Sequence, residues 1–98
     1  MIDKTFILKH NTKEDRQKID AANIHLCVCS RFAGAVWLDY HTSVHNGVHG
    51  VGYGGGEMTD EEAMALFLHE VKNPVYFDDV DEFIKEILAF EKEMKEQQ

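Results

Sequence analysis

The sequence predicts an α+β fold: a small, mainly antiparallel sheet of about four strands, accompanied by three helices. Two observations lead to this prediction. Asn46-Gly47 lies between segments of alternating apolar and polar residues, which is the pattern of a hairpin with a two-residue turn. From Thr59 onward, apolar residues recur at helical spacing in two segments, each opened by a residue that caps helices. We expect residues 1–98 to form one domain.

The first half of the chain predicts two strands with a helix between them. Residues 4–9 and 24–30 have the length and composition of strands. The second run is nearly all apolar, which is typical of a central strand covered on both faces. Thr12 is expected to cap a largely polar helix that ends near Ala22, with Ile19 and Ala22 facing inward.

Cys27 and Cys29 lie within the second of these strands. Two residues apart in a strand, they would share a face, at or beyond the separation that an unstrained disulfide allows. We expect two small buried thiols, and the alternative is half of a redox or metal site. A histidine could activate either thiol as a nucleophile, but an apolar strand gives substrate poor access. His25, at the strand entrance, is expected to be neutral and hydrogen-bonded.

The hairpin is expected to join strands near 35–45 and 48–53. Residues 36–45 also fit one face of a helix, but their β-branched and aromatic content favours a strand. A two-residue turn fixes the register, pairing His45 with Val48, Ser43 with Gly50, His41 with Gly52, and Asp39 with Gly54. Asp39 and His41 would then face glycines, which offer no side chain.

The second half predicts two amphipathic helices. The first begins after Thr59, with Glu62 completing a capping box, and ends before Asn73-Pro74. Its expected buried stripe is Met64, Phe67, Leu68 and Val71. The second begins at Asp78 or Asp79, and residues 75–77 are expected only to connect the two helices. Its apolar residues recur at every third or fourth position: Val80, Phe83, Ile84, Ile87, Phe90 and Met94. For the core, the sequence predicts burial of Trp37, Leu26, Val28, Phe67 and Ile84.

The net charge of −8 is unevenly distributed. Residues 1–56 hold six basic and five acidic residues, a net charge of +1, whereas residues 57–98 hold four and thirteen, a net charge of −9. The acidic half repels phosphate backbones, which argues against direct nucleic-acid binding and favours a partner with a basic surface. No apolar run is long enough to span a bilayer, and the N-terminus lacks the pattern of a signal peptide. These features predict a cytoplasmic protein without membrane association.

Three histidines at four-residue spacing, His41, His45 and His49, follow Asp39. On a helix, His41 and His45 could share a metal ion, but on a strand they lie about 13 Å apart. The strand therefore predicts no metal site, with His41 and His45 as ligands in the alternative. His49 can approach Asp39 and His41 only if the turn is longer than two residues.

Glycines at 50, 52 and 54–56 precede a helix, as in phosphate-binding loops. The acidic residues that open this helix occupy the position that a phosphate would need, so no nucleotide or other cofactor is expected.

These patterns favour a small, acidic, non-enzymatic binding or regulatory protein, for example an inhibitor that docks its acidic face on a basic nucleic-acid-handling protein. One alternative is a metal- or His-dependent hydrolase that uses the His41/His45/His49 region, and another is a structural homodimer. The residues expected to bind a protein partner are the following: Asp39, His41, His45, Asn46, His49, Tyr53, Glu57, Asp60, Glu61, Asp78, Asp79 and Glu82.

Overall fold

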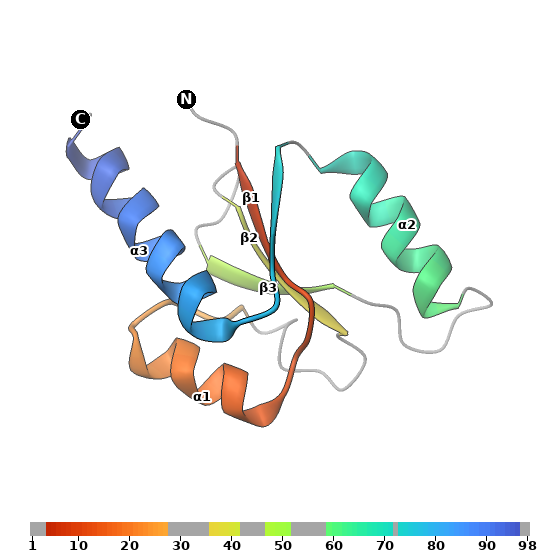
Figure 1. Ribbon diagram of the computed structural model, residues 1–98, viewed down its shortest axis with the longest axis horizontal. Helices are drawn as coiled ribbons and strands as arrows, with labels where there is room; N and C mark the ends of the chain where they lie inside the picture. The colour runs from red at the N-terminus through yellow and green to blue at the C-terminus, as the bar shows by residue number, and fades with distance from the viewer. Residues whose placement is uncertain (1–3, 28–35, 42–46, 52–58, 72, 97–98) are drawn as a thin grey trace.

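The computed structural model describes residues 4–27, 36–41, 47–51, 59–71 and 73–96. In these ranges the chain forms β1 (Thr5–Leu8), α1 (Lys13–Ala21), β2 (Trp37–His41), β3 (Gly47–Val51), α2 (Asp60–Glu70), β4 (Pro74–Phe77) and α3 (Val80–Glu96). The four strands make one sheet in the order β3-β2-β1-β4 (Figure 1). The predicted α+β class, with its four-stranded sheet and two C-terminal helices, is confirmed.

The sheet is mixed. β2 pairs antiparallel with both β1 and β3, whereas β4 lies parallel to β1. The prediction that residues 75–77 only connect two helices was therefore wrong. Pro74 begins β4 at the edge of the sheet, where its missing N–H removes no bond from the ladder. The β-branched and aromatic residues that follow Pro74 suit a strand.

The segment that follows α1 is not the central strand that the sequence predicted. Its described part, residues 24–27, forms an isolated parallel bridge between Leu26 and Val48, on the outer side of β3. Ile24 and Leu26 are buried, whereas His25 is exposed and Cys27 is half-buried. The side chains therefore alternate between two environments, as at a sheet edge, and the segment is not covered on both faces.

A hydrogen-bonded turn at the end of α1 directs this segment toward the core. Asn23 takes a left-handed conformation with φ of 64°. The Asn23 N–H donates to the Asp20 carbonyl (3.1 Å), and the Ile24 N–H donates to the Ile19 carbonyl (3.2 Å). This is the Schellman pattern, in which an apolar contact accompanies the reversal of the chain. Ile19 and Ile24 both belong to the hydrophobic core.

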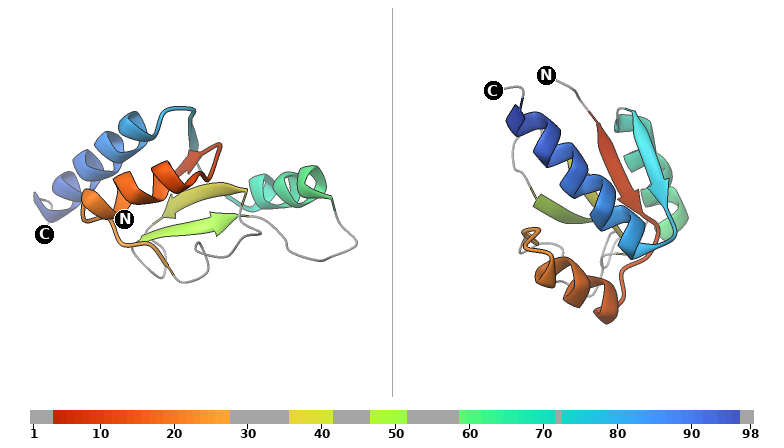
Figure 2. Two further views of the ribbon diagram at one scale, coloured as in Figure 1. Left: turned by 90° about the horizontal axis from the view of Figure 1, so that it is seen from below. Right: turned by 60° about the vertical axis from the view of Figure 1, so that its left-hand side comes forward.

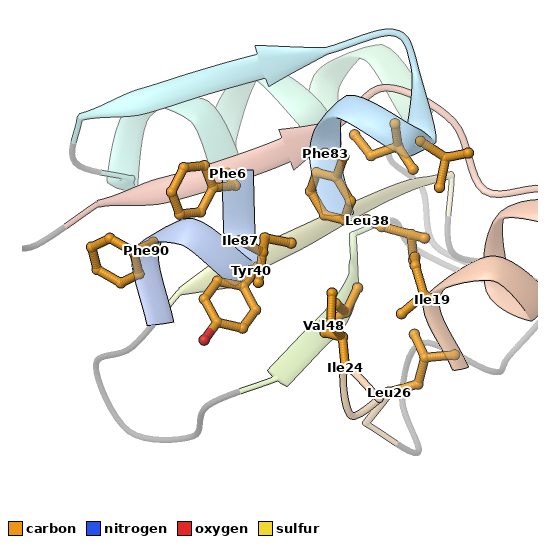
Figure 3. Close-up of a cluster of buried hydrophobic side chains, with 12 residues drawn as sticks. Phe6, Ile19, Ile24, Leu26, Leu38, Tyr40, Val48, Phe83, Ile87 and Phe90 are labelled. Atoms are coloured by element: carbon orange, nitrogen blue, oxygen red, sulfur yellow. The ribbon is translucent and has the colours of Figure 1, made fainter. Parts of the chain in front are cut away.

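The core lies between one face of the sheet and the two helices α1 and α3, which lie together on that face (Figures 1 and 2). The strands contribute Phe6, Leu38, Tyr40 and Val48; Figure 3 shows Phe6 and Tyr40 beside side chains of α3, and Val48 beside Ile24. The predicted repeat in α3 is confirmed, since Val80, Phe83, Ile87 and Phe90 are buried. Of the five residues predicted for the core, Leu26 is buried; Trp37, Phe67 and Ile84 are only half-buried, and Val28 lies outside the described residues.

Helix α2 stands apart from α1 and α3 (Figures 1 and 2). Thr59 caps it as predicted, and its hydroxyl accepts a hydrogen bond from the Glu62 N–H (3.2 Å). In the predicted buried stripe, however, only Met64 is buried, and Phe67, Leu68 and Val71 are half-buried. Among the described elements, α2 takes part in none of the main packing contacts, which explains the incomplete burial of this stripe.

The register of the hairpin differs from the predicted one. The structure pairs His41 with Gly47 and Asp39 with His49, whereas a two-residue turn would pair them with Gly52 and Gly54. Gly47 already belongs to β3, so it cannot be the second residue of a two-residue turn. Residues 42–46 connect the strands and lie outside the described residues. Because Trp37–His41 is a strand, the helical alternative for that part is excluded.

Candidate functional site

The second face of the sheet carries the polar residues that the sequence singled out. Successive side chains of a strand point to opposite faces, and Leu38, Tyr40 and Val48 point into the core. Asp39 and His41 of β2, with His49 of β3, therefore share the opposite face.

The register brings the two histidine rings together. Asp39 lies directly opposite His49, and His41 lies opposite Gly47. Because Gly47 has no side chain, the His41 ring can lean along the sheet toward the His49 ring. The two rings stack with their centroids 4.9 Å apart and an angle of 27° between their planes. His49 therefore lies close to Asp39 and His41, as expected for a connection longer than a two-residue turn.

Asp39 is a buried carboxylate that is paired with a histidine. Its exposed fraction is 2%, and its Oδ2 lies 2.8 Å from Nδ1 of His41. Burial of an ionised carboxylate is costly unless hydrogen-bond donors compensate for the lost water. Since an ionised carboxylate only accepts, Nδ1 of His41 carries the hydrogen, and Nε2 carries the lone pair when the ring is neutral. The His41 side chain is 32% exposed, so the hydrogen-bonded pair consists of a buried carboxylate and a partly exposed ring.

The fourth member of the site, Cys27, comes from the segment after α1. The Cys27 N–H donates to the Val48 carbonyl (2.9 Å), and the Val48 N–H donates to the His25 carbonyl (2.7 Å). Leu26 points into the core, so the neighbouring Cys27 points to the face that carries the histidines. Its Sγ lies 3.7 Å from Nε2 of His49. We refer to Asp39, His41, His49 and Cys27 as the Cys-His cluster.

Gly47 allows the Cys27 segment to approach β3 closely. A Cβ atom at Gly47 would lie 3.0 Å from the His25 carbonyl oxygen and 3.7 Å from Sγ of Cys27. The first distance is shorter than ordinary van der Waals contact. A side chain here would force the backbone of the neighbouring segment to move, so glycine suits this position.

The cluster contains the residue types of nucleophilic and acid–base catalysis: a thiol, two imidazoles and a buried carboxylate that orients one of them. It does not have the arrangement of a metal centre. Among the residues that the structure describes, no three His, Cys, Asp or Glu side chains are placed to hold one ion. His45, the second ligand in the alternative metal prediction, lies outside that part of the chain.

The other predicted binding residues do not join this cluster. His45, Asn46, Tyr53 and Glu57 lie outside the described residues, as does the side chain of Asp60 at the start of α2. Glu61 is exposed on α2, whereas Asp78, Asp79 and Glu82 are exposed at the start of α3, so the acidic residues lie on separate helices (Figure 1). Asp79 also has a local role, since its Oδ1 accepts a hydrogen bond from the Asp81 N–H (3.1 Å). That these residues bind a basic partner stays a prediction.

A second polar cluster, which the sequence analysis missed, joins the start of α1 to the start of α3. Nδ1 of His10 lies 2.5 Å from Oδ2 of Asp15, and Nε2 lies 2.8 Å from the Asp78 carbonyl oxygen. Burial lowers the pKa of His10, but the bonds to Asp78 and Asp15 outweigh burial, and the pKa is raised. Burial alone would raise the pKa of Asp15. Hydrogen bonds from the Thr12 N–H and from His10 outweigh it, and the pKa is lowered.

Tyr40 is a third buried group with a polar partner. Its hydroxyl donates to Oε1 of Glu91 (2.7 Å), which ties the sheet to α3. Burial, followed by this hydrogen bond, raises the pKa of Tyr40. The hydroxyl therefore stays protonated as a structural donor.

No family model, curated protein or solved structure matches this chain. Each helix that the structure describes is too short or too polar to cross a membrane.

Proposed function

We propose that this protein is a small histidine-dependent hydrolase in which Cys27 is the nucleophile and His49 is the base that activates it. The observation that carries the proposal is the 3.7 Å contact between Sγ of Cys27 and Nε2 of His49. A thiol becomes a strong nucleophile when it loses its proton, and an adjacent imidazole can accept that proton. The two residues are 22 positions apart in the chain and meet only because the chain folds.

The position of Cys27 supports this role. In the predicted strand, covered on both faces, Cys27 would be poorly accessible to substrate. Cys27 instead lies at the outer side of β3, and both Cys27 and His49 are half-buried. A half-buried pair is partly shielded from water and still accessible to a small substrate.

The chemistry that fits this pair is acyl transfer from an ester. The Cys27 thiol gives its proton to Nε2 of His49, and the thiolate attacks the acyl carbon. As the carbon–sulfur bond forms and the carbon–oxygen bond breaks, the proton moves from His49 to the leaving oxygen. The product of this half-reaction is an acyl thioester on Cys27 and a free alcohol.

The test uses p-nitrophenyl acetate, an activated ester whose alcohol product absorbs visible light. The wild-type protein should release a burst of p-nitrophenolate, one per protein molecule, followed by a slower steady phase. Cys27→Ala should abolish the burst, and His49→Ala should slow it about 100-fold, the usual contribution of a positioned base.

Cys29→Ala is the matched control, because it removes the neighbouring thiol and should leave the burst intact. Far-ultraviolet circular dichroism of each variant checks that the fold is retained. A burst of normal rate in both Cys27→Ala and His49→Ala would show that neither residue takes part, and the proposal would be abandoned.

A further inference from the structure

The two histidines of the Cys-His cluster have different partners. His49 contacts the Cys27 thiol through Nε2, whereas His41 contacts the buried Asp39 carboxylate through Nδ1. In His41 the Asp39 carboxylate fixes the ring through Nδ1, so Nε2 is the basic atom of the neutral ring. A reaction that needs only one base would not use this second pair.

We infer that His41 is a second catalytic base, which activates the water that hydrolyses the acyl thioester, and that Asp39 is its positioning residue. This inference rests on the proposed function, because it assigns the step that follows acylation of Cys27. Each histidine then serves one half-reaction: His49 serves acylation and His41 serves deacylation.

The second half-reaction balances without a further reactant. A water molecule gives a proton to Nε2 of His41 while its oxygen attacks the thioester carbon. The carbon–oxygen bond forms, the carbon–sulfur bond breaks, and a carboxylic acid leaves. The electron pair of the broken bond stays on sulfur, and the proton held by His41 returns to the thiolate through solvent.

The stacked rings make this division of labour physically reasonable. Their centroids are 4.9 Å apart, so His41 lies beside the histidine that contacts Cys27. The exposure of the His41 ring, 32% of its side chain, allows water to reach it. Asp39 is almost fully buried, and its hydrogen bond to Nδ1 of His41 limits rotation of that ring.

The experiment separates the two half-reactions with p-nitrophenyl acetate as the probe. Stopped-flow absorbance measures the burst, which reports acylation, and intact-protein mass spectrometry measures how long an acetyl group stays on the protein. His41→Ala should keep the burst but slow the loss of the acetyl group about 100-fold, so that the acetylated protein accumulates. His49→Ala should instead slow the burst itself.

Asp39→Asn tests the positioning role. It should also slow deacylation with little effect on the burst, and Asp39→Glu should restore part of the deacylation rate because it restores the carboxylate. His69→Ala is the matched control: it removes an exposed imidazole from α2 and should change neither step. An intact burst in His41→Ala and Asp39→Asn shows that these variants remain folded.

The outcomes distinguish the two proposals. If the wild-type protein shows a burst and His41→Ala loses its acetyl group at the wild-type rate, the role of His41 is wrong and the proposed function stands. If no acetyl group ever appears on wild-type Cys27, both are wrong. If His41→Ala accumulates the acetylated protein and His69→Ala does not, the inference is supported.

Discussion

Two carboxylates are buried in the part of the chain that the structure describes, Asp15 and Asp39, and each contacts a histidine. Asp15 has a structural function: it accepts hydrogen bonds from the Thr12 N–H and His10, and so completes the capping box of α1. Asp39 lies within a strand, where no helix end requires a carboxylate. Because burial of a charge is costly, the buried Asp in the middle of β2 fits the positioning role proposed above.

The His10 cluster predicts a pH dependence of stability. Because the pKa of His10 is raised from 6.5 in the folded state, its stabilising effect is full below 6.5 and is lost as the pH rises through the folded-state pKa. The melting temperature of the wild-type protein should therefore exceed that of His10→Gln more at about pH 5.5 than at about pH 8.5. Differential scanning calorimetry of both proteins across this range measures the difference.

Asp15→Asn provides the complementary measurement on the acid side. The pKa of Asp15 is lowered from 3.8, so its contribution is present above 3.8 and is lost as the pH falls through the folded-state pKa. The acid limb of the stability profile should be flatter in this variant. A constant difference between wild type and His10→Gln at every pH would mean that His10 acts only through packing.

At the scale of single elements, α2 and α3 differ in the burial of their phenylalanines. Phe83 of α3 is fully buried, and Phe67 of α2 is half-buried. Phe83→Ala should therefore cost about 3–5 kcal/mol, and Phe67→Ala should cost about 1–2 kcal/mol, because less apolar surface is lost and no closed cavity forms. Urea unfolding of both variants provides the comparison. Equal costs would indicate that another surface covers α2 in solution.

Elements that depend on local interactions were predicted correctly from the sequence. The caps Thr12 and Thr59 and the apolar repeat of α3 depend on neighbours within four residues, so all three could be predicted without knowing the fold. Partners distant in the chain determine β4 and residues 24–27. The residues of β4 form a strand because β1 offers a parallel edge, whereas Leu26 forms a single bridge at the outer side of β3.

The candidate site could be predicted only in part, for the same reason. Asp39 and His41 are two apart in a strand, so their shared face followed from local spacing. The contact of His49 with both Cys27 and His41 depends on the register of β3 and on the path of residues 24–27. The Asn46-Gly47 signal suggested a two-residue turn and misplaced the register by five residues. A different register would have separated His49 from Asp39.

At the scale of the whole molecule, charge is divided between a nearly neutral first half and a second half with a net charge of −9. Acidic residues are exposed at the start of α3, and their binding to a basic partner stays a prediction. Oligolysine binding provides a direct test, and it should weaken from low to high salt because the Debye length falls below about 8 Å above physiological ionic strength. Reversal of Asp78, Asp79 and Glu82 to Lys should slow association further.

A matched triple reversal, Glu86, Glu93 and Glu96 to Lys, changes the net charge equally but lies farther along α3. If both triple variants bind equally weakly, only net charge matters and the start of α3 is not a docking surface.

Loss of the Asp79 cap should by itself cost about 1 kcal/mol of stability, which thermal unfolding of Asp79→Ala measures separately.

The parallel pairing of β1 with β4 also determines when the protein can fold. β1 lies inside the sheet between β2 and β4, so its parallel neighbour is made about 70 residues later during synthesis. The aromatic contacts of Phe6 with Phe77 and Phe90 likewise form only after those two residues have been synthesised. A nascent chain therefore holds β1 without a finished core until residues 74–90 have emerged from the ribosome, and its apolar residues stay exposed to association with other chains until then.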